Sequence, residues 1–182
     1  MSDTLPTPER PPDRSIVLVG LMGAGKSTVG RRLARRLHLP FLDSDEEIER
    51  AADYEIKEIF DRFGEESFRD GERRVLRRLI SGPPKVIATG GGAFMDDETR
   101  NLILERCIAI WLEAEVETLA TRVARRGHRP LLAGKDPHSL LESLAEVRNP
   151  VYAQAHLRVR SGAGPHERTV DRIVAALAEH SR

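Results

Sequence analysis

The chain has few of the features that mark secreted, membrane or nucleic-acid-binding proteins. Its single cysteine, Cys107, excludes an internal disulfide and is typical of a reducing compartment. Because Cys107 begins an apolar run, a buried core thiol is favoured over a nucleophile. No run of about 18 apolar residues is present, so no membrane-spanning helix is predicted. The net charge is zero, with 29 basic and 29 acidic residues, so no broad basic surface is expected. These features predict a cytoplasmic protein whose partners are neither nucleic acid nor membrane.

Lysine is also scarce, and one lysine lies in the most informative motif. Only four of the 29 basic residues are lysines. Lys26 belongs to Gly20-Leu-Met-Gly23-Ala-Gly25-Lys26-Ser27, which has the form G-x-x-x-x-G-K-S. The apolar run 16–19 precedes the motif, and apolar residues at helical spacing follow it at Val29, Leu33 and Leu37. A buried strand, a glycine-rich loop and a helix are therefore expected in this order, and a glycine-rich turn without a ligand is the less favoured alternative.

The motif predicts a phosphate-binding loop, or P-loop. Its glycines let the backbone approach a ligand closely, so that successive amide N–H groups surround an anion. The N-terminus of the following helix adds partial positive charge. Lys26 is expected to reach the β- and γ-phosphates, and Ser27 to ligate Mg²⁺. ATP and Mg²⁺ are therefore the expected co-substrate and cofactor.

Apolar and helical patterns alternate along the chain. Strands are predicted at 15–20, 40–43, 85–89, 107–112 and 157–159. Helices are predicted at 26–38, 44–52, 55–63, 65–80, 96–105, 115–126, 137–147 and 166–180. This alternation indicates an α/β fold with a five-stranded parallel sheet and helices on both faces, a three-layer sandwich of the P-loop NTPase type. We expect one domain over 15–182, and a disordered extension over 1–14, which holds four prolines and several charges.

Two acids follow the second predicted strand. In parallel sheets, ligands bind beyond the carboxyl ends of the strands, so Asp43 and Asp45 can point into the phosphate cleft. One of them can hold Mg²⁺ through water beside Ser27, and the other can accept a proton from a hydroxyl. The alternative is an N-cap for the next helix, which Asp and Ser favour. The nearby P-loop favours the functional interpretation.

Glycines and arginines supply the other candidates. Gly90–Gly92 follows the third strand, where three glycines indicate close approach of a ligand more than an ordinary turn. Arg69 and Glu72 lie at i, i+3, which fits either a surface ion pair or a guanidinium held toward an anion; spacing alone favours the surface pair. The basic stretch 122–129 is interpreted as a lid or as a solvated helix end. Arg148 is expected to cap the helix at 137–147 or to reach the cleft.

These residues in this order resemble the shikimate kinase family over essentially all of 15–180. The resemblance rests on several blocks, which are 20–28 (GLMGAGKST), 42–45 (LDSD), Phe68-Arg69 with Glu72, Gly90–Gly92, 129–132 (RPLL), and Arg148 with Tyr152. It implies phosphorylation of the 3-hydroxyl of shikimate by ATP and Mg²⁺, in aromatic amino-acid biosynthesis. It also implies a small substrate-binding helical insertion at about 44–73 and a mobile lid at about 125–137.

The family roles, carried onto matching positions, are expectations. The resemblance implies that ATP phosphates bind to Gly23, Ala24, Gly25, Lys26, Ser27 and Thr28. Ser27 would hold Mg²⁺ directly and Asp43 through water, and Asp45 would be the proton acceptor. Shikimate would also contact Arg69, Gly91, Gly92, Arg148, Phe60 and Phe68. Arg129 would lie near the transferred phosphoryl and Arg125 along the adenine. With Lys26 and Arg129, Asp45 completes the expected catalytic set, and a monomer is expected.

The residues favour three other functions less. Gluconate kinase and other small P-loop kinases share the loop and the strand order, but they are not expected to combine the later blocks. A nucleotide-dependent switch or chaperone would need no second anion site, and Asp45, Arg69 and Arg148 speak against it. A degenerate scaffold would tolerate loss of Lys26 or Asp45, and both are present.

Overall fold

A computed structural model describes residues 12–126, 134 and 136–181. In this part of the chain, five parallel strands form one sheet in the order β2-β3-β1-β4-β5. The strands are β1 (Ile16–Val19), β2 (Phe41–Asp43), β3 (Val86–Ala88), β4 (Ile108–Glu113) and β5 (Leu157–Arg160). The helices are α1 (Lys26–Leu37), α2 (Ser44–Ala52), α3 (Ile56–Ile80), η1 (Ala93–Met95), α4 (Asp97–Arg106), α5 (Val116–Arg125), α6 (Pro137–Tyr152) and α7 (His166–His180).

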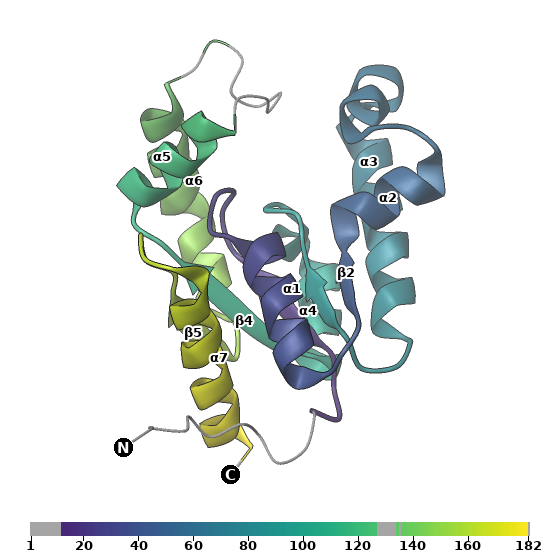
Figure 1. Ribbon diagram of the computed structural model, residues 1–182. Helices are drawn as coiled ribbons and strands as arrows, with labels where there is room; N and C mark the ends of the chain where they lie inside the picture. Colours follow the sequence, from purple (N-terminus) through teal and green to yellow (C-terminus); the bar gives the residue numbers. More distant parts are fainter. Residues whose placement is uncertain (1–11, 127–133, 135, 182) are drawn as a thin grey trace.

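Helices cover both faces of the sheet, so the expected three-layer α/β sandwich is confirmed. Helices α1 and α7 pack against each other on one face, and α4 packs against β4 on the other (Figure 1). Helices α2 and α3 form a pair at the β2 end of the sheet, and α5 and α6 form a pair at the other end. The P-loop lies between these two pairs, beyond the carboxyl end of β1 (Figure 1). This arrangement sets the two helix pairs on either side of any ligand of the loop.

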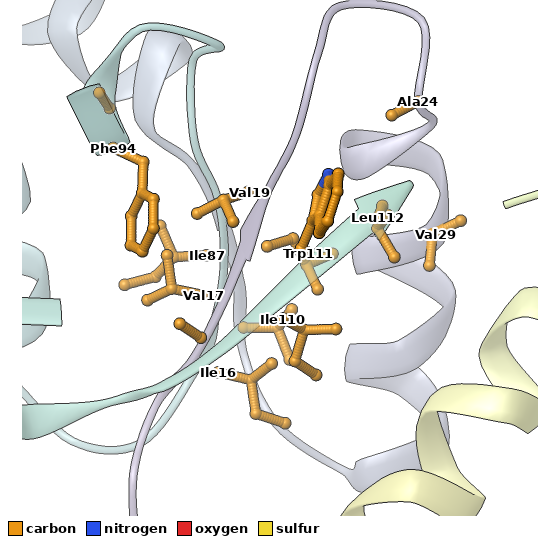
Figure 2. Packing of buried hydrophobic residues seen from close by; sticks show 14 of the residues in the cluster. Ile16, Val17, Val19, Ala24, Val29, Ile87, Phe94, Ile110, Trp111 and Leu112 are labelled. Atoms are coloured by element: carbon orange, nitrogen blue, oxygen red, sulfur yellow. The ribbon is translucent and has the colours of Figure 1, made fainter. Parts of the chain in front are cut away.

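The core is centred on the inner strands. All four residues of β1 and the first five of β4 are buried, as expected for strands covered on both faces. Figure 2 shows Ile16, Val17 and Ile110 packed with their neighbours in this hydrophobic cluster. Cys107 is buried at the start of β4, and burial raises the pKa of its thiol to about 11, so the core-thiol interpretation is confirmed. Within the described residues, every helix is too short or too polar to cross a bilayer.

Some predicted boundaries need correction. The predicted break between 55–63 and 65–80 is real, because α3 leaves helical geometry at Gly64, where φ is 83° and ψ is 173°. The prediction that a helix ends at 147 is wrong, because α6 continues through Pro150 to Tyr152. The Tyr152 ring is fully buried beside Phe94 and Trp111, with centroids 6.4 and 6.1 Å away. This packing holds the last turn in place although Pro150 offers no N–H. Residues 1–11 and 127–133 lie outside the described part, and with them most of the expected extension and lid.

Candidate functional site

The P-loop takes the backbone shape that its glycines permit. Gly23 and Gly25 have φ values of 83° and 91°, in the left-handed region that other residues rarely enter. Lys26, at the start of α1, is 9% exposed, and its Nζ donates to the carbonyls of Gly20 at 2.6 Å and Leu21 at 2.9 Å. The ammonium therefore lies over the loop, where it can reach a bound phosphate.

Ser27 and Asp43 meet beside the loop. Ser27 Oγ donates a 2.5 Å hydrogen bond to Asp43 Oδ2. The other carboxylate oxygen of Asp43 accepts from the backbone N–H of Asp45 at 2.9 Å, which caps α2. The N-cap interpretation of Asp43 is therefore correct, and the same carboxylate also faces the P-loop hydroxyl. A hydroxyl and a carboxylate are hard oxygen donors of the kind that Mg²⁺ prefers.

The three glycines after β3 each make room for a different side chain. A Cβ at Gly90 would lie 2.9 Å from Asp45 Oδ1, and one at Gly91 would lie 3.1 Å from Arg148 Nη1. A Cβ at Gly92 would lie 2.5 Å from Arg69 Nη2. The glycine run thus leaves room for the ends of three charged side chains. It brings together an acid and two arginines that are far apart in sequence.

Arg69 is held by a buried carboxylate. Its Nη1 donates to Glu72 Oε1 at 2.8 Å, and Glu72 is only 2% exposed. The interpretation of this pair as a solvated surface ion pair is therefore wrong. Burial raises the pKa of Glu72, while the hydrogen bond and the charge of Arg69 oppose that shift. Such a pair fixes the direction of the guanidinium, whose Nη2 also lies 3.7 Å from Glu65 Oε1.

Arg148 reaches the same loop from α6. Tyr152, one turn further along this helix, donates from its hydroxyl to the carbonyl of Gly91 at 2.5 Å. Burial raises the pKa of Tyr152 to about 12, so the phenol remains a neutral donor. The hydrogen bond fixes the end of α6 against the glycine loop. Of the two sequence interpretations of Arg148, a cap that ends the helix near 147 is excluded because α6 continues to Tyr152, and Arg148 Nη1 lies against the glycine loop.

The aromatic candidates lie on α3, and Arg125 of the expected lid lies at the end of α5. The rings of Phe60 and Phe68 lie 4.6 Å apart between centroids; Phe68 is buried and Phe60 is 36% exposed. Arg125 is the last residue of α5 and is exposed. The next residue, Arg126, lines the cleft instead. Arg129 lies outside the described residues.

One cleft brings the P-loop together with the acids after β2 and the glycines after β3. Its lining residues come from the P-loop, the β2–α2 junction, the loop after β3 and the end of α5, and they are Met22, Gly23, Gly25, Lys26, Ser27, Asp43, Asp45, Thr89, Gly90, Gly91 and Arg126. Two hydrogen bonds that hold the walls of this cleft were not predicted from the sequence. Thr89 Oγ1 donates to the carbonyl of Leu18 at 2.8 Å, and Ser44 Oγ accepts from Gly90 N at 3.3 Å. Small hydroxyl residues at strand ends carry no sequence signal of their own.

The fold and the cleft together define a class of protein. A phosphate-binding loop follows the central strand of a parallel sheet, and Asp45 and the glycine loop line the same cleft, with Arg69 and Arg148 packed against that glycine loop. This is the arrangement of a P-loop kinase.

Comparison with known proteins identifies the family. The shikimate kinase family model matches residues 22–178. A shikimate kinase from Zymomonas mobilis is 57% identical over 173 residues, which cover 95% of this chain and 98% of the relative. A structure of shikimate kinase from Acinetobacter baumannii in complex with shikimate superposes with a TM-score of 0.90 at 38% identity, covering 96% of this chain and 98% of that one. A gluconokinase from Sinorhizobium meliloti gives a TM-score of 0.59 at 25% identity, covering 95% and 97%. The chain belongs to the shikimate kinase family.

Proposed function

We propose that this chain transfers the γ-phosphoryl group of ATP to the 3-hydroxyl of shikimate, giving shikimate 3-phosphate and ADP in aromatic amino-acid biosynthesis. The observation that carries the proposal is the packing of Arg69 and Arg148 against the glycine loop after β3, beside Asp45. Asp45 and the glycine loop line the same cleft as the P-loop, and the two guanidinium groups lie against that glycine loop. The family assignment supports the same reaction.

The residue types suit an anionic polyol as acceptor. Guanidinium groups are planar and bind carboxylates through paired hydrogen bonds, so Arg69 and Arg148 would hold the shikimate carboxylate. Gly91 and Gly92 would contact the ring through their backbone, and Phe60 and Phe68 would pack nearby. Asp45 would bind the acceptor hydroxyl. As the 3-oxygen bonds to the γ-phosphorus and the bond to the bridging oxygen of ADP breaks, Asp45 would take the hydroxyl proton.

The donor side would use Gly23, Ala24, Gly25, Lys26, Ser27 and Thr28 to hold the ATP phosphates. Phosphoryl transfer depends mainly on positioning and on stabilising charge, which fits backbone amides and a single ammonium at Lys26. From the lid, Arg129 would approach the transferred phosphoryl and Arg125 the adenine.

Magnesium fits the residues at the loop. The described residues contain no group of three or more acidic, His or Cys side chains able to enclose a metal. Mg²⁺ is usually held by one or two protein oxygens together with substrate phosphates and water, and Ser27 with Asp43 matches that pattern. Ser27 would bind the ion directly and Asp43 through water. When bound, Mg²⁺ would neutralise phosphate charge.

The remaining expectations are part of the same proposal. One kinase domain would span 15–182, with a substrate-binding segment at about 44–73, a mobile lid at about 125–137 and a disordered extension at 1–14. The protein would act as a monomer in the cytoplasm. Size-exclusion chromatography with light scattering tests the oligomeric state.

A coupled ADP-release assay with three alternative acceptors tests the function. Shikimate should support turnover, and gluconate and quinate should support little, because Arg69 and Arg148 would hold a carboxylate in the geometry that the shikimate ring gives it. The product should be identified by phosphorus NMR as the 3-phosphate. Turnover with gluconate but not with shikimate would contradict the proposal.

A further inference from the structure

The carbonyls of the glycine loop after β3 are bonded in two different ways. The carbonyl of Gly90 accepts from the N–H of Ala93 at 3.2 Å, and that of Gly92 accepts from a backbone N–H of η1 at 3.1 Å. The carbonyl of Gly91, between them, accepts from the hydroxyl of Tyr152 at 2.5 Å. Tyr152 lies 61 residues further along the chain, at the end of α6. The middle peptide of the loop is therefore held by a side chain from another element.

The ring of Tyr152 is fixed in the core. It is fully buried, and its centroid lies 6.4 Å from that of Phe94 and 6.1 Å from that of Trp111. Phe94 belongs to η1, which directly follows the glycine loop, and Trp111 lies on β4. Because a buried phenol needs a hydrogen-bond partner, the packing of the ring also fixes where its hydroxyl donates.

Gly91 is the residue at which Tyr152, Arg148 and the P-loop meet. A Cβ at Gly91 would lie 3.1 Å from Arg148 Nη1 and 3.8 Å from the Tyr152 hydroxyl oxygen. It would also lie 3.7 Å from the carbonyl of Gly20, at the start of the P-loop. Burial raises the pKa of Tyr152, while the charge of Arg148 and a hydrogen bond from its guanidinium lower it. The phenol thus connects Arg148 with the peptide between Gly91 and Gly92.

The hydrogen bond to Gly91 restrains a peptide that could otherwise rotate. Glycine has no Cβ, so the backbone on both sides of the peptide between Gly91 and Gly92 has wide conformational freedom. A trans peptide is planar, and its C=O and N–H point in opposite directions. Holding the Gly91 carbonyl toward the buried ring therefore directs the Gly92 N–H away from that ring. Because Gly91 lines the cleft beside Asp45, a rotation of this peptide would change the wall of the cleft.

We propose that Tyr152 is a positioning residue for the acceptor: its hydroxyl fixes the peptide between Gly91 and Gly92 in the orientation in which the glycine loop and Arg148 hold the acceptor carboxylate. The inference rests on the proposed function, because it concerns the acceptor side of the same cleft. Tyr152 acts through the loop backbone and does not touch the reacting atoms.

Tyr152→Phe, which removes the hydroxyl and keeps the ring, tests the inference on the full chain. In steady-state kinetics the KM for shikimate should rise about five- to tenfold, as expected for losing a hydrogen bond to a carbonyl. Both kcat and the KM for ATP should stay within about twofold of the wild type, because the loop would bind the acceptor equally in the ground state and the transition state.

Nuclear magnetic resonance of the ligand-free chain gives a second readout that needs no turnover. The Gly92 amide shares its peptide group with the Gly91 carbonyl, so its resonance reports the orientation of that peptide. In Tyr152→Phe this resonance should shift and broaden as the peptide gains other orientations.

Tyr152→4-aminophenylalanine tests whether the hydrogen bond is the cause. The amino group places an N–H donor at the same position on the ring. It should recover most of the loss in the KM for shikimate and return the Gly92 resonance toward its wild-type position. Loss of ring packing alone would not be corrected in this way.

Ser143→Ala is a matched control. Ser143 also lies on α6, and its hydroxyl also donates to a backbone carbonyl, but the acceptor is Ser139 of the same helix, at 3.0 Å. Its loss should leave both KM values and the Gly92 resonance unchanged. Thermal unfolding followed by the fluorescence of Trp111, the single tryptophan, checks the fold and the ring packing of each variant, because Trp111 lies beside Tyr152.

The outcomes separate this inference from the function. A wild-type KM for shikimate or an unchanged Gly92 resonance in Tyr152→Phe overturns the inference, as does the absence of recovery with 4-aminophenylalanine. A lower kcat with an unchanged KM, together with a lower unfolding temperature, assigns the hydroxyl a structural role and also overturns it. A wild-type chain that does not phosphorylate shikimate contradicts the proposed function, while the Gly92 resonance still decides whether Tyr152 orients the loop.

Discussion

The guanidinium of Arg69 lies directly against Gly92, so closely that a Cβ there would be 2.5 Å from Nη2 and 2.7 Å from Nη1. Gly92 itself has φ −91° and ψ −11°, which any residue can adopt. The glycine is therefore needed for space and not for backbone freedom. Because Glu72 holds the other side of Arg69, moving the guanidinium away from Gly92 would disturb that ion pair.

This relationship predicts that Gly92→Ala displaces Arg69 and weakens the acceptor site. The KM for shikimate should rise about tenfold or more, which corresponds to about 1.4 kcal/mol, and the KM for ATP should change little. Steady-state kinetics with each substrate varied in turn measures both values. Gly71→Ala is the matched control, because a Cβ at this helical position would meet nothing within 4 Å. That variant should keep wild-type kinetics, and an unchanged shikimate KM in Gly92→Ala would refute the prediction.

Lys26→Ala should remove most of the activity. The ammonium is expected to stabilise negative charge on the phosphates as the transfer proceeds, and loss of such a donor costs about 3 kcal/mol or more, or at least about a hundredfold in kcat. Single-turnover measurements at saturating ATP and shikimate test this. Unimpaired turnover would exclude a catalytic role for the P-loop lysine.

Arg148→Ala should weaken shikimate binding selectively. Truncating one partner of a buried charge pair costs about 2–5 kcal/mol, and here the partner is the substrate carboxylate. Affinity for ADP should stay within about twofold of wild type. Calorimetric titration with shikimate and with ADP separates the two effects. Equal losses for both ligands would indicate that Arg148 supports the end of α6 instead of the acceptor.

Stability should fall as the pH drops below about 6.5, in part through His156. Its Nδ1 accepts the backbone N–H of Ala109 at 2.9 Å, which requires the neutral ring. Burial, followed by the charges of Arg14 and His180, lowers the pKa of His156 below its ordinary 6.5, against a smaller opposing hydrogen bond to the backbone of Leu104. Below pH 6.5 the unfolded chain therefore binds a proton that the folded chain resists. The stabilisation is complete above pH 6.5 and is lost as the pH falls from there through the lower pKa of the folded chain.

Urea denaturation at pH 8 and pH 5.5 measures this effect. His156→Asn keeps an acceptor that does not titrate, so its free energy of unfolding should fall less than that of the wild type between these pH values. The hydrogen bond itself is worth about 1 kcal/mol. His138→Asn, at an exposed position, is the control and should follow the wild type. The prediction fails if both variants show the wild-type pH dependence.

The strands and the P-loop could be predicted from the sequence because their signals are local. The apolar run of β1 and the glycine spacing after it lie within about a dozen residues. The break at Gly64 was visible for the same reason. The end of α6 was not, because a proline at 150 locally indicates a stop, while burial of Tyr152 against β4 and η1 is a tertiary effect.

The candidate site was only partly predictable. Asp45, Arg69 and Arg148 could be named from the family resemblance, but spacing alone favoured a surface role for Arg69. Its actual environment depends on Gly92, which is distant in sequence. The hydrogen bond of Tyr152 was not visible, because its acceptor is a backbone carbonyl, and any sequence would supply one. Contacts of this kind depend on the folded chain and leave no pattern in the sequence.

In the strand order β2-β3-β1-β4-β5, most of the proposed acceptor residues lie on one side of the central strand, β1. Asp45, Arg69 and the glycine loop belong to β2, β3 and the helices beside them. Arg148 is the exception, because it reaches the glycine loop from α6, at the β5 end of the sheet. A change of acceptor would therefore involve helices on both sides of the central strand.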